Sequence, residues 1–309
     1  MSRIVIALGG NALGDTPQEQ KILTESVAES IVDLVEMGHT VVVAHGNGPQ
    51  VGMIQKGLEY ASENNVIKAS MPLPECGAMS QGYIGYQLQN SIDNELVKRG
   101  LGGRAVSIVT QVVVDADDKA FHHPTKPIGS YYSKEQAEKL MSELGISMVE
   151  DSGRGYRQVV ASPKPNDVVE KNIIKSVAET GNVVIAVGGG GIPVVMRDGV
   201  LCGVPAVIDK DLAAEKLAEC LNADVLIILT AVERVAVNYG KPDQRWISSM
   251  TVSEAAEYIG QNQFAPGSML PKVQASMAFA RRGGTAVIAA LEKAKDAIEG
   301  NSGTKIVNG

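Results

Sequence analysis

The sequence predicts an α/β protein whose mostly parallel central sheet is covered by helices on both faces. Short apolar runs rich in β-branched residues alternate along the chain with longer segments of helical pattern. Glycine-rich loops follow several of these runs directly. The 309 residues, 44% of them hydrophobic, are enough to bury a large core. This length fits either two domains or one large α/β unit.

The first strand–helix–strand unit sets the pattern. Residues 4–8 are a continuous apolar run, which is typical of a buried parallel strand. Thr16 and Glu19 form a capping box around Pro17, so a helix is predicted from there to about residue 37. Residues 40–44 then give the second strand.

The same alternation continues to the end of the chain. Further strands are predicted at residues 104–109, 112–114, 183–187, 225–229, 236–239, 285–289 and 305–307, with a hairpin at 194–201 that turns at Asp198 and Gly199. Further helices are predicted near residue 50, at 76–99, 133–144 and 167–180, after Asp209, and at 253–259, 270–282 and 291–299. Residues 115–165 have the weakest apolar periodicity, so we expect them to leave the main sheet.

Composition argues against several classes of partner. The chain has 28 basic and 35 acidic residues and a formal charge of -7, which argues against binding nucleic acid or an anionic membrane. The three cysteines are far apart, odd in number and without metal-ligand spacing, which favours a reducing compartment. No signal peptide is visible, and no apolar run approaches the roughly 18 residues of a membrane helix. We therefore predict a cytoplasmic protein.

Glycine-rich loops mark the predicted ligand site. Four predicted strand ends stand out: Gly9-Gly10-Asn11, Gly46-Asn47-Gly48, Gly188-Gly189-Gly190-Gly191 and Thr230-Ala231. Ligands of open α/β sheets bind at the carboxyl ends of the strands, where glycine lets backbone amides approach an anion. One or two glycines suffice for a turn, so the four-glycine run asks for another explanation. Together the loops point to phosphate-rich or carboxylate ligands.

Three lysines stand where a phosphoryl group could be held. Lys210 follows Asp209, a predicted N-cap, and so falls in the first turn of a helix. Lys272 is also near a helix start, and Lys126 lies between two prolines. Taken alone, Lys210 also fits a solvated surface lysine flanked by aspartates. With the glycine loops, the three lysines favour phosphoryl transfer, which needs positioning and charge neutralisation more than covalent chemistry.

Other common site motifs are missing from the sequence. It contains no dinucleotide-binding fingerprint, no P-loop and no nucleophile elbow. His122 and His123 have no acidic or cysteine partner at ligand spacing, so no metal site made of protein ligands is predicted. An acceptor that is already an anion needs no general base, which agrees with the lack of an obvious one.

Eight stretches together resemble the carbamate kinases of the amino-acid kinase superfamily. They are ALGGNA at residues 7–12, GNGPQVG at 46–52, CGAMSQGYIG at 76–85, PTKPIG at 124–129, GGGGIP at 188–193, AVIDKDLA at 206–213, VAVNYGKP at 235–242 and FAPGSMLPK at 264–272. The glycine loops belong to the wider superfamily. The stretch at 76–85 and the loop at 124–129 are similar to carbamate kinases in particular.

The resemblance implies a fold and an organisation. It implies an open three-layer αβα sandwich with a mostly parallel central sheet, formed by one amino-acid kinase domain over residues 1–309. The carbamate lobe is expected at about residues 1–210, with a small protruding subdomain at about 115–165. The nucleotide lobe is expected at about 211–309. Similar proteins are homodimers that often serve arginine breakdown.

The resemblance also implies an activity, reversible phosphoryl transfer between ATP and carbamate, and a set of site residues. The implied catalytic residues are Lys126, Lys210, Lys272 and Asp209. Gly9, Gly10 and Asn11 would hold the phosphoryl group, and Gly46, Asn47 and Gly48 the carbamate. The nucleotide pocket would be lined by Thr230, Ala231, Tyr239 and Met269. Mg²⁺ would be carried by the nucleotide phosphates, without a named protein ligand.

One position departs from the wider superfamily. Many of its amino-acid kinases carry a lysine just before the Leu-Gly-Gly of the first strand, whereas Ala7 stands here. The missing charge is expected from Lys126 or Lys210, and the departure argues against a glutamate or acetylglutamate kinase. Two alternatives stay open, another small-carboxylate kinase and a non-catalytic nucleotide-binding paralogue that regulates a partner.

Overall fold

The computed structural model of the chain describes residues 1–9, 14, 16–151, 153 and 155–309. Its central sheet has eight strands in the order β15-β17-β16-β12-β1-β2-β9-β3. These strands are β1 (Arg3–Leu8), β2 (Thr40–His45), β3 (Ala105–Ser107), β9 (Val183–Ile185), β12 (Val225–Thr230), β15 (Ser249–Thr251), β16 (Thr285–Ala290) and β17 (Thr304–Val307). Neighbours are parallel except for β16 and β17, which confirms the mostly parallel sheet.

Strand β1 shows why helices must cover both faces of this sheet. Its side chains alternate between two cores: Ile4, Ile6 and Leu8 join one cluster, and Val5 and Ala7 join the other. Both sets are fully buried, so neither face of the strand meets solvent. A strand buried on both faces has the continuous apolar run seen in the sequence.

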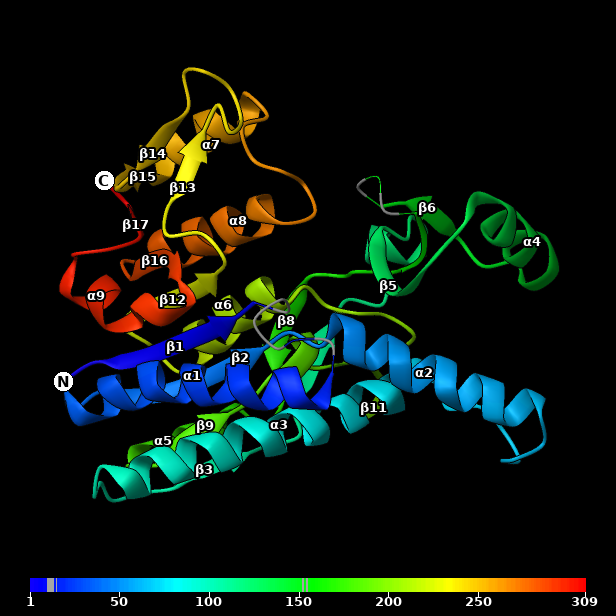
Figure 1. Cartoon of the computed structure of the whole chain (residues 1–309), viewed down its shortest axis with the longest axis horizontal. Coiled ribbons are helices and arrows are strands. Elements are labelled where there is room, and N and C mark those ends of the chain that lie inside the picture. Colours follow the sequence, from blue (N-terminus) through cyan, green and yellow to red (C-terminus); the bar gives the residue numbers. More distant parts are fainter. Residues whose placement is uncertain (10–13, 15, 152, 154) are drawn as a thin grey trace.

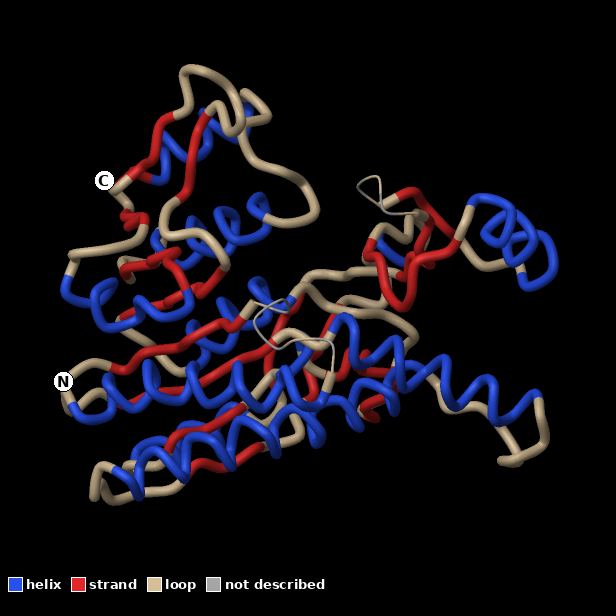
Figure 2. The backbone as a smooth tube through the Cα atoms, viewed as in Figure 1, coloured by secondary structure: helices blue, strands red, loops and turns tan. Residues whose placement is uncertain are grey.

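The helices form the two outer layers (Figures 1 and 2). Three helices share the core of Ile4 and Ile6: α1 (Pro17–Glu36), α3 (Leu73–Lys98) and α9 (Ala294–Glu299). Four helices share the core of Val5 and Ala7: α5 (Lys171–Glu179), α6 (Lys210–Cys220), α7 (Val252–Gly260) and α8 (Met269–Ala280). This is the expected three-layer αβα sandwich.

Three smaller sheets surround the central one. A four-stranded sheet has the order β11-β10-β4-β8 and contains β4 (Gln111–Val114), β8 (Pro165–Val168), β10 (Ile192–Arg197) and β11 (Val200–Gly203). A two-stranded sheet pairs β13 (Val235–Val237) with β14 (Arg245–Ile247). The predicted β10–β11 hairpin is confirmed, and its turn residues Asp198 and Gly199 both have positive φ (50° and 80°).

Residues expected to leave the main sheet build a small unit of their own. It contains an antiparallel sheet of order β5-β7-β6 with β5 (Lys126–Tyr132), β6 (Met148–Glu150) and β7 (Tyr156–Val160), and the helix α4 (Lys134–Leu144). A short 3₁₀ turn (Lys119–Phe121) precedes it. In Figure 1 this unit projects from the body above α2 (Gly48–Glu63). We call the unit at residues 126–160 the projecting subdomain.

Several predicted boundaries differ from the observed ones, and two helix starts show why. The helix expected from residue 167 begins only at Lys171, because Asp167 and Val168 pair with Val113 and Val112 of β4. The helix expected from residue 76 begins at Leu73. Pro74 is tolerated there because its missing N–H belongs to the helix start, where no intrahelical acceptor exists.

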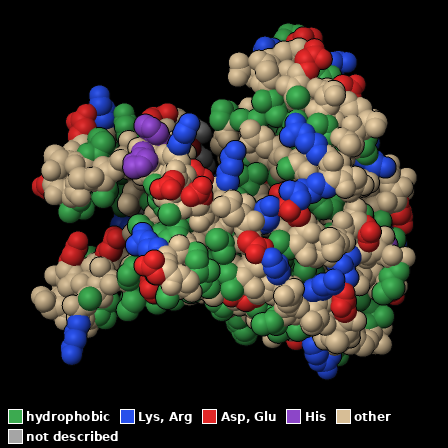
Figure 3. All heavy atoms as spheres, turned by 180° about the vertical axis from the view of Figure 1, so that it is seen from behind, with side chains coloured by type: hydrophobic (Ala, Val, Ile, Leu, Met, Phe, Trp, Pro, Cys, Tyr) green, Lys and Arg blue, Asp and Glu red, His purple; other side chains and the backbone are tan. Residues whose placement is uncertain are grey.

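The length of the helices and the distribution of surface charge are relevant to where the chain could reside. None of the helices in the described ranges is long and apolar enough to cross a membrane. On the face seen in Figure 3, acidic and basic side chains are interspersed without one large patch of either sign.

Candidate active site

Three of the predicted strand-end loops meet at one edge of the central sheet. Strands β12, β1 and β2 are neighbours and parallel, so their carboxyl ends lie side by side. The amide of Gly9 donates to Leu229 O at 3.1 Å, and the amide of Gly46 donates to Leu8 O at 3.1 Å. Gly9, Gly46 and Thr230 therefore surround one region. Gly10 and Asn11, the other predicted phosphoryl-binding residues, lie outside the described residues.

Helix α3 holds the Gly46-Asn47-Gly48 loop in place through a side-chain hydrogen bond. Asn47 is the N-cap residue of α2, yet its side chain makes no capping hydrogen bond. Instead its Nδ2 donates to Ser80 Oγ of α3 at 2.8 Å, and Asn47 is only 6% exposed. The N–H groups of the first α2 turn lack intrahelical acceptors and can bind an anion. The contact with Ser80 fixes the Asn47 side chain beside this helix start.

His45 supports the same loop as a neutral side chain. It is buried, and its Nδ1 lies 2.8 Å from Gly46 O. Burial lowers the pKa of His45 to about 4, although the hydrogen bond to Gly46 opposes the shift. The ring is therefore neutral near pH 7. Since a carbonyl only accepts, Nδ1 carries the ring proton and donates it to Gly46 O.

The four-glycine run is explained by four close approaches. A Cβ on Gly188 would lie 2.4 Å from His45 Nε2, and one on Gly189 would lie 2.0 Å from Asn47 Nδ2. A Cβ on Gly190 would lie 2.2 Å from Ile208 O, and one on Gly191 would lie 2.3 Å from Val112 Cγ2. Each position excludes a side chain for a different neighbour. The run thus packs the Asn47 loop against the segment that enters α6.

Gln81 of α3, which the sequence did not suggest as a site residue, fixes this run. Its Nε2 donates to Gly188 O and to Thr110 O, both at 3.1 Å, and its Oε1 accepts from the Thr110 amide at 2.7 Å. The side chain is 2% exposed. Ser80 and Gln81 are consecutive, so one stretch of α3 positions both loops.

Three predicted lysines and two aspartates form one cluster at the start of α6. Lys126 of β5 donates to Asp209 Oδ2 at 2.6 Å. Lys210 donates to Asp211 Oδ1 at 2.8 Å, and Lys272 of α8 donates to Asp211 Oδ2 at 2.9 Å. Asp209 is the N-cap of α6 and accepts from the Asp211 amide at 2.9 Å. We call these five residues the lysine cluster.

The lysine cluster carries net positive charge. Three ammonium groups face two carboxylates, which leaves one positive charge beside the positive end of the α6 dipole. Although burial opposes its ionisation, Lys126 and Lys210 lower the pKa of Asp209 to about 2. Burial lowers the pKa of Lys272, and the charge of Lys210 adds to this against the attraction of Asp211. A bound anion would oppose this shift and stabilise the charged form of Lys272.

Asp211 is the cluster residue that sequence reasoning missed. Each of its carboxylate oxygens holds a different lysine, and the residue is 2% exposed. In the sequence it is one of two aspartates flanking Lys210, and an acidic residue in a first helical turn is ordinary. Its partner Lys272 is 61 positions further along the chain. Only the packing of α8 on α6 brings the two together.

The predicted nucleotide-binding residues are more scattered. Thr230 ends β12 beside β1, and Ala231 follows it in an exposed position. Met269 begins α8, three residues before Lys272, and is partly buried. Tyr239 is 70% exposed. Across the described ranges, no hydrogen bond or ion pair joins Tyr239 or Met269 to the lysine cluster.

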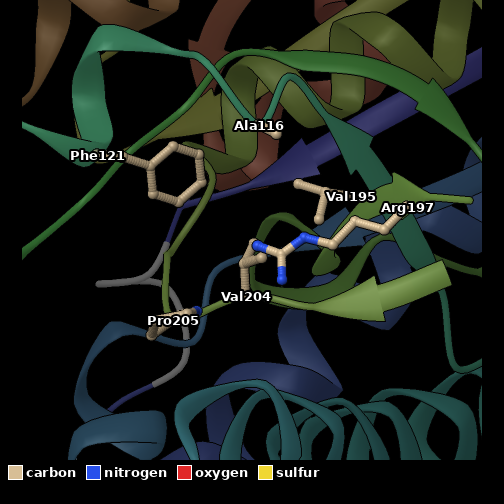
Figure 4. A pocket seen from close by; sticks show the side chains of 6 residues that line it. All are labelled: Ala116, Phe121, Val195, Arg197, Val204 and Pro205. Atoms are coloured by element: carbon tan, nitrogen blue, oxygen red, sulfur yellow. The ribbon is translucent and has the colours of Figure 1, made fainter.

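A separate cavity of about 200 Å³ lies near the root of the projecting subdomain (Figure 4). It is lined by Ala116, Phe121, Val195, Arg197, Val204 and Pro205. Phe121 and Arg197 face it from opposite sides. None of the predicted site residues lines it. Among the described residues, no group of three or more His, Cys, Asp or Glu side chains is arranged to hold a metal ion.

Comparison with known proteins decides the family. The model of the amino acid kinase family matches residues 2–290. A carbamate kinase of Clostridium perfringens is 54% identical over 312 residues, which cover 99% of both chains. The chain belongs to the carbamate kinases of the amino acid kinase family. The resemblance noted in the sequence is thereby confirmed.

Two further relatives of this carbamate kinase chain cover it almost completely. The carbamate kinase-like protein YqeA of Escherichia coli is 51% identical over 306 residues, 98% of each chain. The structure of carbamate kinase from Giardia lamblia bound to AMP-PNP superposes with a TM-score of 0.90 at 41% identity. It covers 99% of this chain and 98% of its own. The αβα sandwich is therefore the fold of the family.

Proposed function

We propose that this chain catalyses reversible phosphoryl transfer between ATP and carbamate. In the synthetic direction a carbamate oxygen attacks the γ-phosphorus of ATP, the bond from that phosphorus to the β–γ bridging oxygen breaks, and ADP leaves. In reverse, carbamoyl phosphate and ADP give ATP and carbamate, which decomposes to ammonia and bicarbonate. The observation that carries the proposal is the lysine cluster, in a chain that matches carbamate kinases over its full length.

The roles of the cluster follow from its charges. Lys210 and Lys272 would neutralise oxygens of the transferring phosphoryl group, as positioned cations do in phosphoryl transfer. Asp211 would keep both ammonium groups in place, since it contacts each of them. Asp209 would do the same for Lys126, which comes from the projecting subdomain. No general base is needed because carbamate is already an anion.

The remaining site residues are assigned by position. The Gly46-Asn47-Gly48 loop would hold carbamate at the start of α2, with Gly9, Gly10 and Asn11 on the phosphoryl group. Thr230, Ala231, Tyr239 and Met269 would line the nucleotide pocket. We place the carbamate lobe at about residues 1–210, including a subdomain at about 115–165, and the nucleotide lobe at about 211–309.

Mg²⁺ fits this site as part of the nucleotide. The Asp209 and Asp211 carboxylates are both engaged by lysines, which argues against either as a metal ligand. Nucleotide phosphates are the usual oxygen ligands of Mg²⁺ in kinases. The ion would add charge neutralisation to that supplied by the lysines.

The test is ATP formation from carbamoyl phosphate and ADP with Mg²⁺, measured for the wild type and for Lys210→Ala. Because Lys210 would contact the transferring group, its loss should lower kcat by about 10²-fold or more. Lys216→Ala is the matched control, since Lys216 is on the same helix but pairs with Glu219. It should keep the wild-type rate. A folded wild-type protein that forms no ATP contradicts the function, and an active Lys210→Ala contradicts the role of that lysine.

A further inference from the structure

A buried acceptor beside the proposed carbamate loop lacks a donor. Gln50 is 2% exposed, and its Oε1 accepts no hydrogen bond from the described residues. Most buried side-chain oxygens have a partner, because an unmade hydrogen bond away from water is unfavourable. A buried oxygen kept in this state points to a donor that arrives with a ligand.

The orientation of the Gln50 carboxamide is fixed by its other end. Its Nε2 donates to Gly14 O at 3.1 Å. Because a carbonyl accepts and does not donate, the NH₂ group must be the end that faces Gly14, which leaves Oε1 as the free end.

Gln50 also has the right place in the fold. It is in the first turn of α2, the helix whose N-cap is Asn47 of the proposed carbamate loop. Side chains of a helix lean toward its N-terminus, so that of Gln50 leans toward this loop. The carboxamide therefore lies between the start of α2 and Gly14.

The proposed substrate has a feature that the other site groups do not distinguish. The ammonium groups of the three lysines and the backbone amides are donors and serve carboxylate or phosphate oxygens, and the cluster carboxylates are already engaged by the lysines. They would bind acetate as well as carbamate. Carbamate differs by an amino group in place of a methyl group, and an amino group calls for an acceptor.

We infer that Gln50 Oε1 accepts a hydrogen bond from the amino group of carbamate and so selects carbamate over carboxylates that carry a methyl group there. The inference rests on the proposed function. It makes Gln50 a specificity-determining residue, since a site built to hydrogen-bond a substrate N–H rejects the analogue that lacks it.

The chain supplies a matched control in Gln20 of α1. Its Nε2 donates to the same carbonyl, Gly14 O, at 3.3 Å, and Gln20 is also 2% exposed. Its Oε1, however, already accepts from the Tyr83 hydroxyl. Both glutamines are thus buried and donate to Gly14 O, and they differ in whether their Oε1 accepts a hydrogen bond.

The experiment compares two phosphoryl donors. ATP formation from ADP and Mg²⁺ is measured with carbamoyl phosphate and with acetyl phosphate, for the wild type, Gln50→Met and Gln20→Met. In both reactions an ADP oxygen attacks the transferred phosphorus, and carbamate or acetate leaves. The readout is the ratio of the two kcat/KM values, because a purely structural defect lowers both equally.

We expect the wild type to prefer carbamoyl phosphate by at least about tenfold, as one hydrogen bond to a buried group allows. Gln50→Met should lower kcat/KM for carbamoyl phosphate by about tenfold and leave kcat/KM for acetyl phosphate unchanged. Gln20→Met should keep the wild-type ratio. Gln50→Ala, which adds no volume, replaces Gln50→Met where that variant does not fold.

Three results overturn the inference. One is an unchanged ratio in Gln50→Met. Another is a wild-type ratio near one, which needs no variant to fold. A folded wild type that uses neither donor or only acetyl phosphate instead overturns the proposed function, and with it the inference.

Discussion

At the scale of single residues, the site depends on buried polar groups whose partners come from distant parts of the chain. Asp211 holds Lys210 and Lys272 together, and Gln81 holds Gly188 beside Thr110. Removing such a partner leaves a buried charge or amide unpaired, which is more destabilising than losing an exposed contact. The geometry of the site is therefore expected to be sensitive to changes that never touch a substrate.

His45 should make the stability of the fold depend on pH. Its pKa is about 4 when folded and about 6.5 when unfolded, so between these values the unfolded chain binds more protons. This contribution to stability is complete above about pH 6.5 and is lost as the pH falls toward 4. At pH 5 we expect the free energy of unfolding to be lower than at pH 7.5 by about 2 kcal/mol from this residue.

The measurement is urea denaturation at both pH values for the wild type, His45→Gln and His122→Gln. His45→Gln should lose most of the pH dependence, because glutamine does not titrate. His122 is exposed, so His122→Gln should keep it. An equal pH dependence in all three proteins would show that burial does not hold His45 neutral.

The same residues show what the sequence could and could not predict. The sequence predicts Lys210, Lys272 and Lys126 as site residues because local signals mark them: two helix starts and two flanking prolines. Asp211 and Gln81 have no local signal, since their roles arise from contacts with Lys272, 61 positions away, and Gly188, 107 positions away. Local patterns predict cations near helix starts, but only the folded chain shows what positions them.

At the scale of elements, the glycines within one helix differ in whether a neighbouring atom excludes a side chain. Helix α3 contains Gly77, Gly82 and Gly85, but only Gly85 has a close neighbour. A Cβ there would lie 2.1 Å from Ser107 Oγ, whereas Gly77 and Gly82 face open space.

The boundary between a strand and a helix was also ambiguous in the sequence, because residues 165–168 show no pattern that separates strand from helix. Pairing with β4 decides it.

Helix α2 offers a direct test of how the projecting subdomain is seated. A Cβ on Gly52 would lie 2.3 Å from the Cα of Gly129 in β5, the strand that begins with Lys126. Gly52→Ala should push β5 away and draw Lys126 from Asp209. We expect stability to fall by about 1–3 kcal/mol and kcat/KM for carbamoyl phosphate to fall by about tenfold or more.

Gly57→Ala is the control in the same helix. Gly57 is exposed and a Cβ there meets nothing, so the change should stabilise the fold by about 0.5–1 kcal/mol and leave kcat/KM unchanged. Thermal unfolding and steady-state kinetics measure both effects. Full activity in Gly52→Ala would mean that the seating of β5 on α2 does not position Lys126.

At the scale of the whole molecule, several contacts tie the projecting subdomain to the body, and two of them bear on the candidate site. One is the backbone contact between Gly52 and Gly129, and the other is the ion pair between Lys126 and Asp209. The second contact ends at the N-cap of α6, where Lys210 and Asp211 begin the helix.

The three layers of the fold could be predicted from the alternation of apolar runs, because each strand buried on both faces requires two helical layers. The subdomain had only its weak periodicity as a signal.

A last prediction concerns the assembly of two chains, which we propose as a homodimer. Helix α3 keeps apolar side chains on its outer side: Met79 is 43% exposed and Tyr86 is 67% exposed, and they are two helical turns apart. Gly82 lies between them, exposed and with nothing within reach of a Cβ, so another backbone could approach closely there. Such a surface suits a second copy of the same helix in a two-fold interface.

Light scattering after size exclusion should therefore give the mass of two chains for the wild type and of one chain for Tyr86→Lys, because a lysine on this face would meet its own copy across the two-fold axis. Tyr60→Lys is the matched control, since Tyr60 on α2 is also 67% exposed but lies on another surface. A wild type with the mass of one chain contradicts the homodimer. A dimeric Tyr86→Lys would keep the homodimer and move its interface away from α3.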